Sequence, residues 1–472
     1  MRKIVRSLLL CCFGSLSAHA QISSFQHVIV IVQENRTPDN LFQGLCKSPS
    51  PSVSFCSTTP NPSQYNIQTT DWLDKNSPGG TTQPTTVPLA NAYDLSHAHS
   101  AFVKMCNAEV ATALCKMDGA GDIACSGTCP VKPQFRFVDN STGILTPYIQ
   151  LASQYGWANY MFQTNQGPSF PAHQFLFGGT SAPSAADDAA GIFAAENMSG
   201  TASTAGCIAD ADTTVELITP SGENRKIYPC FEHATMGDLL AVSLTWRYYT
   251  PSAGSIWTAP NAIQHICQSS GPGGKCMGQD WADNVDLKPA NVLTDIANCK
   301  LRAVSWVVPT GANSDHAASN DGGGPSWVAS IVNAVGNSAA CDNNSGYWKN
   351  TAIFITWDDW GGWYDHEPPT ILASPQGDYQ YGFRVPLIVV SAYTPHTINN
   401  VRHDFGSILR FIEHNFGMQE GALNFADARA TTDLSGFFNL NRPPRAFQKI
   451  SSEKDASFFL NDKRPATDPD DD

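Results

Sequence analysis

Short, continuous runs of apolar residues, many of them β-branched, recur along this chain and predict the strands of a sheet. Four such runs, each seven residues long, cover residues 27–33, 302–308, 351–357 and 385–391. Continuous apolar runs of this length are typical of strands that are buried on both faces, as in a parallel α/β sheet. We therefore expect an α/β protein with these runs in its core.

Apolar residues that are spaced three or four positions apart predict helices elsewhere in the chain. These patterns cover residues 234–243, 325–336 and 404–416, and Gly417 directly after the last one is a typical C-terminal helix cap. Strand patterns that alternate with helical ones indicate a sheet whose strands are mostly parallel.

The runs at residues 27–33 and 351–357 both end abruptly in polar side chains. Glu34 and Asn35 follow the first run, and Asp358 and Asp359 follow the second. In open α/β sheets the ligand site lies beyond the carboxyl ends of the strands, so we expect these side chains to meet at one edge. Their oxygen atoms suit a hard divalent cation. The alternative is that the acids only cap the helices that follow the strands.

Several histidines accompany these acids. His316 follows Asp315 beyond the run at 302–308, His366 also follows an aspartate, and His97 lies three residues after one. A single histidine after a strand is usually a surface or capping residue. Three of them beside an acidic edge favour a phosphate pocket, in which histidines exchange protons or support negative charge.

Ser169 is the candidate nucleophile. It lies between turn residues in the segment from Gly167 to His173, which predicts an accessible hydroxyl. Serine beside glycine and proline is also ordinary loop chemistry, and Thr164 in the same loop is a competing nucleophile. The segment lacks the Gly-x-Ser-x-Gly pattern of esterases, which disfavours a Ser-His-Asp acyl hydrolase.

The first twenty residues predict a secretory signal. Arg2, Lys3 and Arg6 form a basic start, an apolar stretch follows, and a small-residue cleavage site ends at Ala20. The apolar stretch is too short to span a bilayer. We expect a periplasmic or secreted protein without a stable membrane anchor.

Cysteine content fits an oxidising compartment. Two of the 14 cysteines lie in the predicted signal, which leaves an even number. We expect disulfides, most simply between neighbours, with Cys299 and Cys341 joined. The alternative for Cys125 and Cys129 is half of a zinc site, but no second pair has matching spacing. The remaining cysteines are Cys46, Cys56, Cys106, Cys115, Cys125, Cys129, Cys207, Cys230, Cys267, Cys276, Cys299 and Cys341.

Charge excludes one class of partner. The formal net charge is −14, and loss of the three basic signal residues brings it to about −17. The chain has no basic stripe for nucleic acid, so we expect no nucleic-acid partner. Recognition of a phosphate group must then be local, through a metal ion and a few histidine or arginine side chains.

The chain is long enough for one large α/β domain with insertions. We expect this domain at residues 21–442, with an insertion or cap region at about 171–300. Within the insertion, residues 180–230 are rich in Ala, Ser, Thr and Gly and predict loops rather than sheet. Residues 443–472 end in a run of aspartates and predict a disordered acidic tail.

Several sequence blocks resemble the phosphoesterase family that contains bacterial and plant phospholipases C and acid phosphatase A. The resemblance runs from about residue 25 to residue 417, and the first and fifth blocks are highly specific. The first is similar to the ENRSFDH signature, the third to a T/S-x-P-N-R nucleophile block, and the fifth to a D-[DE]-x-G-G-x-[YF]-D-H block. In chain order the blocks are Glu34–Asn40, Asp94–His97, Ser169–His173, Asn313–His316, Asp358–His366, Phe383–Pro386 and Ser407–Glu413.

This resemblance implies an alkaline-phosphatase-like three-layer α/β fold around a mostly parallel sheet, with disulfide-stapled loop insertions. It implies one divalent metal ion, and it implies that Ser169 is both the nucleophile and a metal contact. The roles that it carries over are metal binding for Glu34, Asn35, Ser169, Asp358 and Asp359, catalysis for Ser169, His97 and His316, and substrate binding for Asn35, Asp315 and His366.

The chain also departs from the family pattern. Ala172 and His173 stand where the nucleophile block has Asn-Arg, Ser319 and Asn320 stand near the place of a second histidine, and Phe405 replaces a histidine after Asp404. The first hypothesis is an exported, metal-dependent, phospholipase C-like phosphoesterase. The alternatives are an acid phosphatase that acts on phosphomonoesters, and a catalytically weak phosphate- or lipid-binding protein on the same fold.

Overall fold

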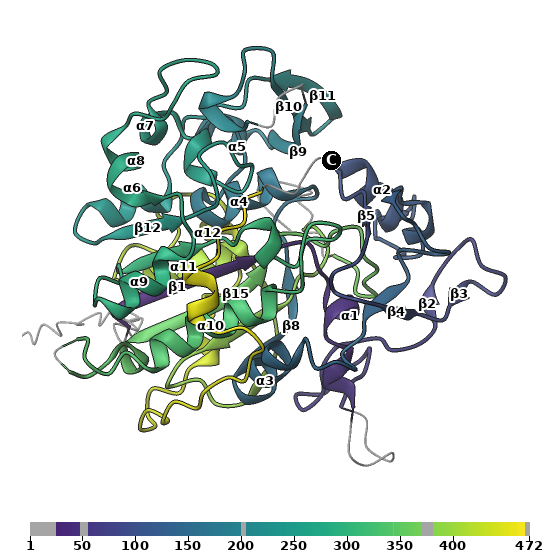
Figure 1. Cartoon of the computed structure of the whole chain (residues 1–472). Helices are drawn as coiled ribbons and strands as arrows, with labels where there is room; N and C mark the ends of the chain where they lie inside the picture. Colours follow the sequence, from purple (N-terminus) through teal and green to yellow (C-terminus); the bar gives the residue numbers. More distant parts are fainter. Residues whose placement is uncertain (1–24, 48–54, 200–203, 343, 370–380, 468–472) are drawn as a thin grey trace, which may run out of the picture.

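The computed structural model describes residues 25–47, 55–199, 204–342, 344–369 and 381–467. The predicted signal at residues 1–20 lies outside these ranges, as do the last five residues. Within them, one large sheet runs through the middle of the molecule, and helices cover it (Figure 1).

The large sheet has eight strands in the order β13-β12-β14-β1-β15-β16-β8-β17. β16 runs antiparallel to both of its neighbours, and the other neighbouring pairs are parallel. The strands are β1 (His27–Gln33), β8 (Gly156–Phe162), β12 (Trp246–Tyr249), β13 (Val285–Asp286), β14 (Val304–Val307), β15 (Thr351–Trp357), β16 (Leu387–Val390) and β17 (Thr397–Asp404).

The four apolar runs of the sequence are confirmed as neighbouring strands of this sheet. β1 and β15 have the predicted bounds, and every residue in both is buried. The sequence pattern did not indicate β17, because most of its residues are polar and partly or fully exposed, as is typical of an edge strand.

Helices pack on both faces of the sheet, so the fold has three layers. Phe411 of α11 packs on Phe354 of β15, with ring centroids 4.9 Å apart, whereas Tyr148 of α3 packs on Trp357 at 5.1 Å. Phe354 and Trp357 point to opposite faces because side chains alternate along a strand.

One group of helices contacts α10, and a second group is built around α4 and α11. The first group is α3 (Thr146–Gln154), α9 (Asn291–Ala297), α10 (Gly324–Gly336) and α13 (Ala456–Leu460). The second is α4 (Ser169–Gly178), α6 (Met236–Ala241), α11 (Phe405–Asn415) and α12 (Ala426–Arg429). The predicted helices at 234–243, 325–336 and 404–416 are therefore confirmed as α6, α10 and α11.

Shorter elements connect these layers. The helices among them are α1 (Pro38–Leu41), α2 (His99–Cys106), α5 (Ala185–Ala189), α7 (Gln264–Cys267) and α8 (Gln279–Asn284). The strands are β2 (Trp72–Leu73), β3 (Thr81–Thr82), β4 (Thr85–Val87), β5 (Tyr93–Leu95), β6 (Cys125–Gly127) and β7 (Arg136–Val138).

The prediction of loops without a sheet at residues 180–230 is wrong. This region contains a three-stranded antiparallel sheet made of β9 (Phe193–Ser199), β10 (Thr214–Thr219) and β11 (Gly222–Ile227). Val215 and Leu217 of β10 are fully buried and alternate with less buried residues, which is the pattern of a half-buried strand. The wider region 171–300 also contributes β12 and β13 to the main sheet, so it is not a separate cap throughout.

Disorder was expected after residue 442, and this is wrong for residues 443–467. Ile450 is fully buried, and Phe459 of α13 packs on Trp327 of α10 with ring centroids 5.2 Å apart. Arg445 donates a hydrogen bond to the carbonyl of Gln154 at 2.7 Å. A few scattered apolar residues pack this segment against the domain. The acidic composition of the segment predicted disorder because these residues are few.

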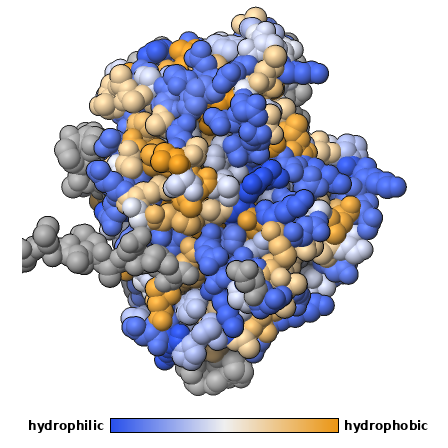
Figure 2. Space-filling view, turned by 90° about the vertical axis from the view of Figure 1, so that its left-hand side faces the viewer, coloured by the Kyte–Doolittle hydropathy of each residue, from blue (hydrophilic) through white to orange (hydrophobic). Residues whose placement is uncertain are grey.

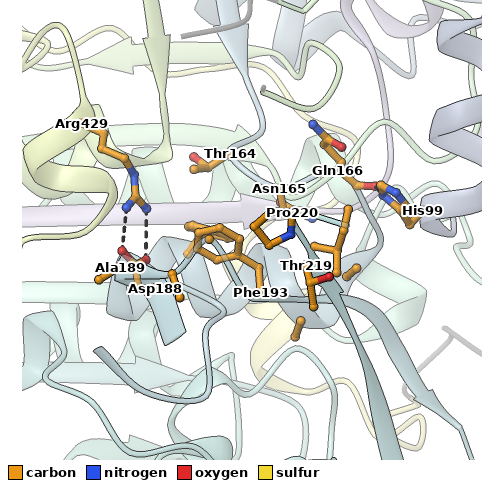
Figure 3. A pocket seen from close by; sticks show the side chains of 16 residues that line it. His99, Thr164, Asn165, Gln166, Asp188, Ala189, Phe193, Thr219, Pro220 and Arg429 are labelled. Carbon is orange, nitrogen blue, oxygen red and sulfur yellow. Dashed lines mark hydrogen bonds and ion pairs between the residues drawn. The ribbon is translucent and has the colours of Figure 1, made fainter. Parts of the chain in front are cut away.

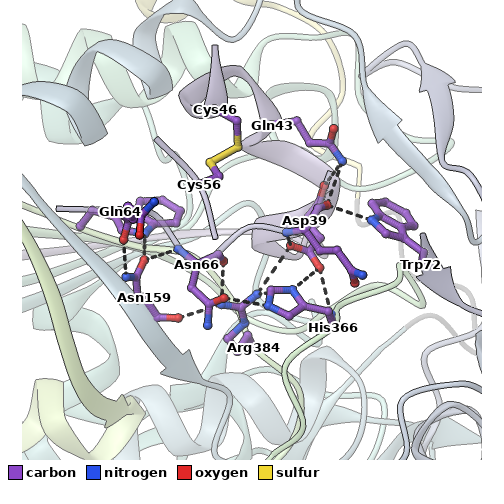
Figure 4. Close-up of a disulfide and its surroundings, with 12 residues drawn as sticks. Asp39, Gln43, Cys46, Cys56, Gln64, Asn66, Trp72, Asn159, His366 and Arg384 are labelled. Atoms are coloured by element: carbon purple, nitrogen blue, oxygen red, sulfur yellow. Dashed lines mark hydrogen bonds and ion pairs between the residues drawn. A yellow bond between two sulfur atoms is a disulfide. The ribbon is translucent and has the colours of Figure 1, made fainter. Parts of the chain in front are cut away.

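Every cysteine of the described chain forms a disulfide with its neighbour in sequence, as predicted. Cys125 therefore pairs with Cys129 and leaves no thiolate for zinc. The other pairs are Cys46–Cys56, which Figure 4 shows, Cys106–Cys115, Cys207–Cys230, Cys267–Cys276 and Cys299–Cys341.

Among the described residues, no helix has the length and apolar character needed to cross a bilayer. The face of the molecule in Figure 2 is largely hydrophilic, with small groups of apolar residues between the polar ones.

Candidate functional site

The parallel pairing of β1 with β15 brings the two acidic strand ends together. Gln33 lies opposite Trp357 in the last pair of the register, so Glu34 and Asp358 leave the sheet side by side. The amide of Asn35 donates to Asp358 Oδ1 at 3.1 Å. Asn35 itself adopts a left-handed backbone conformation, with φ of 60°. The predicted meeting of these side chains at one sheet edge is confirmed.

A glycine in the loop after β15 makes this close approach possible. Gly361 has φ of 61°, and a Cβ atom on it would lie 2.4 Å from the carbonyl oxygen of Asn35. The amide of Gly361 donates to Asp359 Oδ1 at 2.7 Å. The loop therefore orients Asp359 while its backbone lies directly against Asn35.

Ser169 reaches the same edge from the other side. It is the first residue of α4, and its hydroxyl donates to Asp359 Oδ2 at 3.2 Å. The positive end of a helix dipole favours negative charge at this position. Thr164, the competing nucleophile, instead donates to Asp404 and accepts from the amide of Phe405 at the start of α11.

His173 lies one turn after Ser169 on α4 and joins the acids. Its Nε2 atom is 3.3 Å from Glu34 Oε1 and 3.8 Å from Asp358 Oδ2, and all three side chains are fully buried. Sequence reasoning treated His173 only as a departure from the family pattern. The spacing of four residues from Ser169 was the available signal, because it places two side chains on one helix face.

His97 and His316 lie beside the acids. His97 Nδ1 is 2.9 Å from the carbonyl of Leu95 and Nε2 is 3.1 Å from the side-chain amide nitrogen of Asn35, so Nδ1 carries the proton and Nε2 accepts. His316 Nδ1 donates to the carbonyl of Ala317 at 2.7 Å. The centroids of the His97 and His316 rings are 5.9 Å apart.

Asp315 makes its contacts away from these acids. Its Oδ2 atom accepts from the hydroxyl of Tyr148 at 2.8 Å and from the indole of Trp357 at 3.0 Å. Burial raises the pKa of Asp315 to about 6, and these hydrogen bonds and Arg36 oppose that rise. The contacts of this carboxylate are those of a core residue between α3 and β15.

His366 belongs to a separate cluster around Arg384 (Figure 4). It contacts Asp39 Oδ2 and Asn66 Oδ1, each at 2.7 Å, and Arg384 binds both oxygens of Asp365. Burial raises the pKa of Asp365 to about 6, whereas the positive charge of Arg384 lowers it. This cluster fastens the loop after β15 to α1, and it does not include the carboxylates of the sheet edge.

The donor set at the sheet edge fits a divalent cation. It offers three carboxylates, one amide oxygen, one hydroxyl and one imidazole. Asp358 Oδ2 and Asn35 Oδ1 are buried without a hydrogen-bond partner among the described residues. Buried oxygen atoms without a donor are costly, and a bound cation would remove that cost. Asp365 and Glu420, which belong to the other two clusters of possible ligands, each pair with an arginine.

The six side chains of the donor set at the sheet edge are all fully buried. A dry environment strengthens each electrostatic interaction within the site. Ser169 is therefore buried, and the prediction of an accessible hydroxyl in a loop is wrong, because the residue begins a helix that packs against the sheet edge.

A cavity of about 400 Å³ lies beside the site but does not include it (Figure 3). Thr164, Gln166, Phe193 and Arg429 are among the residues that line it. Asp188 already neutralises Arg429, with two hydrogen bonds of 2.7 and 3.3 Å. The cavity therefore offers no unpaired positive charge from this arginine to a phosphate group.

Comparison with known proteins gives a family match over most of this chain and similarity to individual proteins over shorter parts of it. A model of the Phosphoesterase family matches residues 25–419. Phospholipase C B of Mycobacterium tuberculosis is 28% identical over 178 residues, which is 33% of this chain and 33% of that protein. Non-hemolytic phospholipase C of Pseudomonas aeruginosa is 24% identical over 234 residues, 43% of this chain and 32% of that protein. The chain thus spans about a third of the length of these relatives.

Among solved structures, a protein in the alkaline phosphatase superfamily from Vibrio parahaemolyticus aligns with 58% of this chain and 60% of its own. The TM-score is 0.31 and the sequence identity 11%, too low a likeness to support an argument. The family match covers both strand-end acids, Ser169 and the two histidines. On that match, this chain belongs to the Phosphoesterase family.

Proposed function

We propose that this protein is an exported, metal-dependent phosphoesterase that hydrolyses phosphate esters through a phosphoserine, in the manner of phospholipases C. The main support is the contact between Ser169 Oγ and Asp359 Oδ2 at 3.2 Å, at the start of a helix and at the edge where β1 and β15 deliver their acids. Family membership and the similarity to proteins named phospholipase C support the same reaction class.

One divalent ion, held by Glu34, Asn35, Asp358 and Asp359 with Ser169 in contact, would supply positive charge to the phosphoryl oxygens. Asp359 Oδ2 accepts the Ser169 proton while Oγ forms a bond to phosphorus and the bond to the leaving oxygen breaks. His97 or His316, in its imidazolium form, gives its Nε2 proton to that oxygen as it leaves. Water then attacks the phosphorus of the phosphoserine and gives a proton to the same histidine, while the bond between Oγ and phosphorus breaks. Oγ takes its proton back from Asp359, and phosphate or a phosphomonoester is released.

The positions of the histidines support this division of roles. The hydrogen bonds that both Nδ1 atoms donate to backbone carbonyls fix the tautomer, so Nε2 is the nitrogen that takes up and gives back a proton. Both rings are buried, so they support developing negative charge without competition from water.

The two alternatives differ in what they hydrolyse. An acid phosphatase would cleave phosphomonoesters, whereas a catalytically weak binding protein would hold a phosphate or lipid without turnover. The gathering of nucleophile, carboxylates and both histidines, despite the departures from the family pattern, favours an enzyme over the binding protein.

The test compares chelator-treated and metal-reloaded protein on a chromogenic phosphomonoester and on a phosphocholine diester. We expect turnover of the diester only in the metal-loaded protein, and loss of at least about 10³-fold in Asp358→Ala. Asp212→Ala, at an exposed position, is the matched control and should keep full activity. Turnover that survives both metal removal and Asp358→Ala would exclude the proposed centre, and turnover of the monoester alone would select the acid phosphatase.

A further inference from the structure

One face of α4 carries two groups toward the acids of the sheet edge. Ser169 and His173 are separated by one helical turn, and both are fully buried. Ser169 contacts Asp359, and His173 contacts Glu34 and Asp358. The helix therefore delivers an imidazole nitrogen into a group of oxygen ligands.

The far side of the His173 ring determines which nitrogen is protonated. The Tyr248 hydroxyl donates its one proton to the carbonyl of Trp257 at 2.8 Å, and it lies 3.2 Å from His173 Nδ1. The hydroxyl must therefore accept from His173, so Nδ1 carries a proton. In the neutral ring this directs the lone pair of Nε2 at Glu34 and Asp358, which is the orientation of a metal ligand supported from behind.

The distances also suit ligands of one ion better than a direct ion pair. A charged hydrogen bond between imidazole and carboxylate is about 2.8 Å long, whereas Nε2 is 3.3 Å from Glu34 Oε1. Two atoms at this separation could instead both lie about 2.0–2.2 Å from one ion between them.

We propose that His173 is a direct ligand of the metal ion, and that its imidazole makes the site prefer a transition-metal ion such as Zn²⁺ over Ca²⁺ or Mg²⁺. This inference rests on the proposed function, because it concerns the same metal centre. Imidazole suits zinc and its neighbours in the first transition row, whereas Ca²⁺ and Mg²⁺ prefer oxygen alone. An arginine, which the family block has at this position, is always charged and cannot ligate a metal.

The experiment loads chelator-treated protein with Zn²⁺ and records its zinc-edge X-ray absorption spectrum. We expect imidazole scattering in the wild type and one imidazole fewer in His173→Gln. Competition with a chelator should show at least a tenfold loss of Zn²⁺ affinity in that variant, with Ca²⁺ affinity changed less than about threefold. His265→Gln is the control, because His265 pairs with Glu232 and Asp238 at the surface and should change neither measurement.

A second variant separates ligation from folding. Tyr248→Phe removes the acceptor behind His173 and should lower Zn²⁺ affinity by about 10- to 100-fold while leaving the imidazole in place. The wild-type spectrum needs no substitution, so it is decisive even if His173→Gln fails to fold. A zinc shell made only of oxygen ligands, in an enzyme that still needs metal, would overturn this inference alone. Protein that binds no metal at all would overturn it together with the metal-dependent function.

Discussion

At the scale of single residues, the Ser169 hydroxyl carries the proposed chemistry. Ser169→Ala should lower phosphate-ester cleavage by at least about 10³-fold, because no other group replaces the attacking oxygen. The loss of one hydroxyl should change stability by less than about 1 kcal/mol, so unfolding would not explain the lost activity. Ser169→Thr should retain some turnover, because it keeps a hydroxyl.

The measurement is to trap the phosphoenzyme and to locate the label by peptide mass. Ser330→Ala, which removes a buried serine of α10, is the control and should keep its activity. A label on Thr164, or unchanged turnover in Ser169→Ala, would show that the nucleophile is another residue.

Asp315 gives a prediction on pH. Burial raises its pKa to about 6, above the usual value of 3.8. Its contribution to folding is therefore complete below pH 3.8 and is lost as the pH rises through 6. Asp315→Asn removes this titration and keeps an acceptor oxygen for Tyr148 and Trp357. Between pH 4 and pH 7, the variant should gain about 2 kcal/mol of unfolding free energy relative to the wild type.

Urea unfolding at several pH values from 4 to 7 measures this difference. Asp212→Asn, at an exposed position, should follow the wild type throughout. Parallel stability curves for Asp315→Asn and the wild type would contradict the prediction.

At the scale of elements, the loop after β15 must lie against the end of β1. Gly361→Ala would place a Cβ atom 2.4 Å from the carbonyl of Asn35 in a left-handed conformation. We expect a loss of more than about 3 kcal/mol of unfolding free energy, because steric overlap adds to backbone strain. Gly80→Ala separates the two effects. Gly80 also has a positive φ but has open space around it, so it should lose only about 1 kcal/mol.

Denaturant unfolding of both variants, with the bound metal measured alongside, checks this prediction. Equal losses in Gly361→Ala and Gly80→Ala would show that the contact with Asn35 does not constrain the site.

At the scale of the whole molecule, disulfides stabilise the fold because they lower the conformational entropy of the unfolded chain. The Cys299–Cys341 bridge spans 42 residues and Cys125–Cys129 spans four. In the chain-entropy account, replacing the first pair by alanine should cost about 4 kcal/mol, and replacing the second about 2 kcal/mol. Unfolding in guanidinium without reductant measures both. The reverse order would show that native packing, rather than loop length, decides their value.

The strands and their acids could be predicted from the sequence because each depends on local pattern. The runs at 27–33 and 351–357 are buried along their whole length, so their apolar residues are uninterrupted. The common location of the acids at the ends of these runs then follows, because the carboxyl ends of parallel strands lie at the same edge of a sheet. The even number of cysteines predicted disulfides, and neighbour pairing was the simplest arrangement, but only the structure gives the connectivity. By contrast, β10 and the segment after residue 442 each have only a few buried residues. Their overall composition is polar or small, so it predicted loops and disorder instead of packed structure.

The sequence by itself determined the α/β class, the two acidic strand ends and the family to which the chain belongs, and it indicated that the cysteines form disulfides. Only the tertiary structure decided which side chains face the acids. It turned His173 toward Glu34 and Asp358, gave Asp315 partners in the core, and placed His366 beside Arg384. The physical reason is that a residue pattern indicates burial and periodicity, whereas the direction of a polar side chain depends on partners that lie hundreds of residues away.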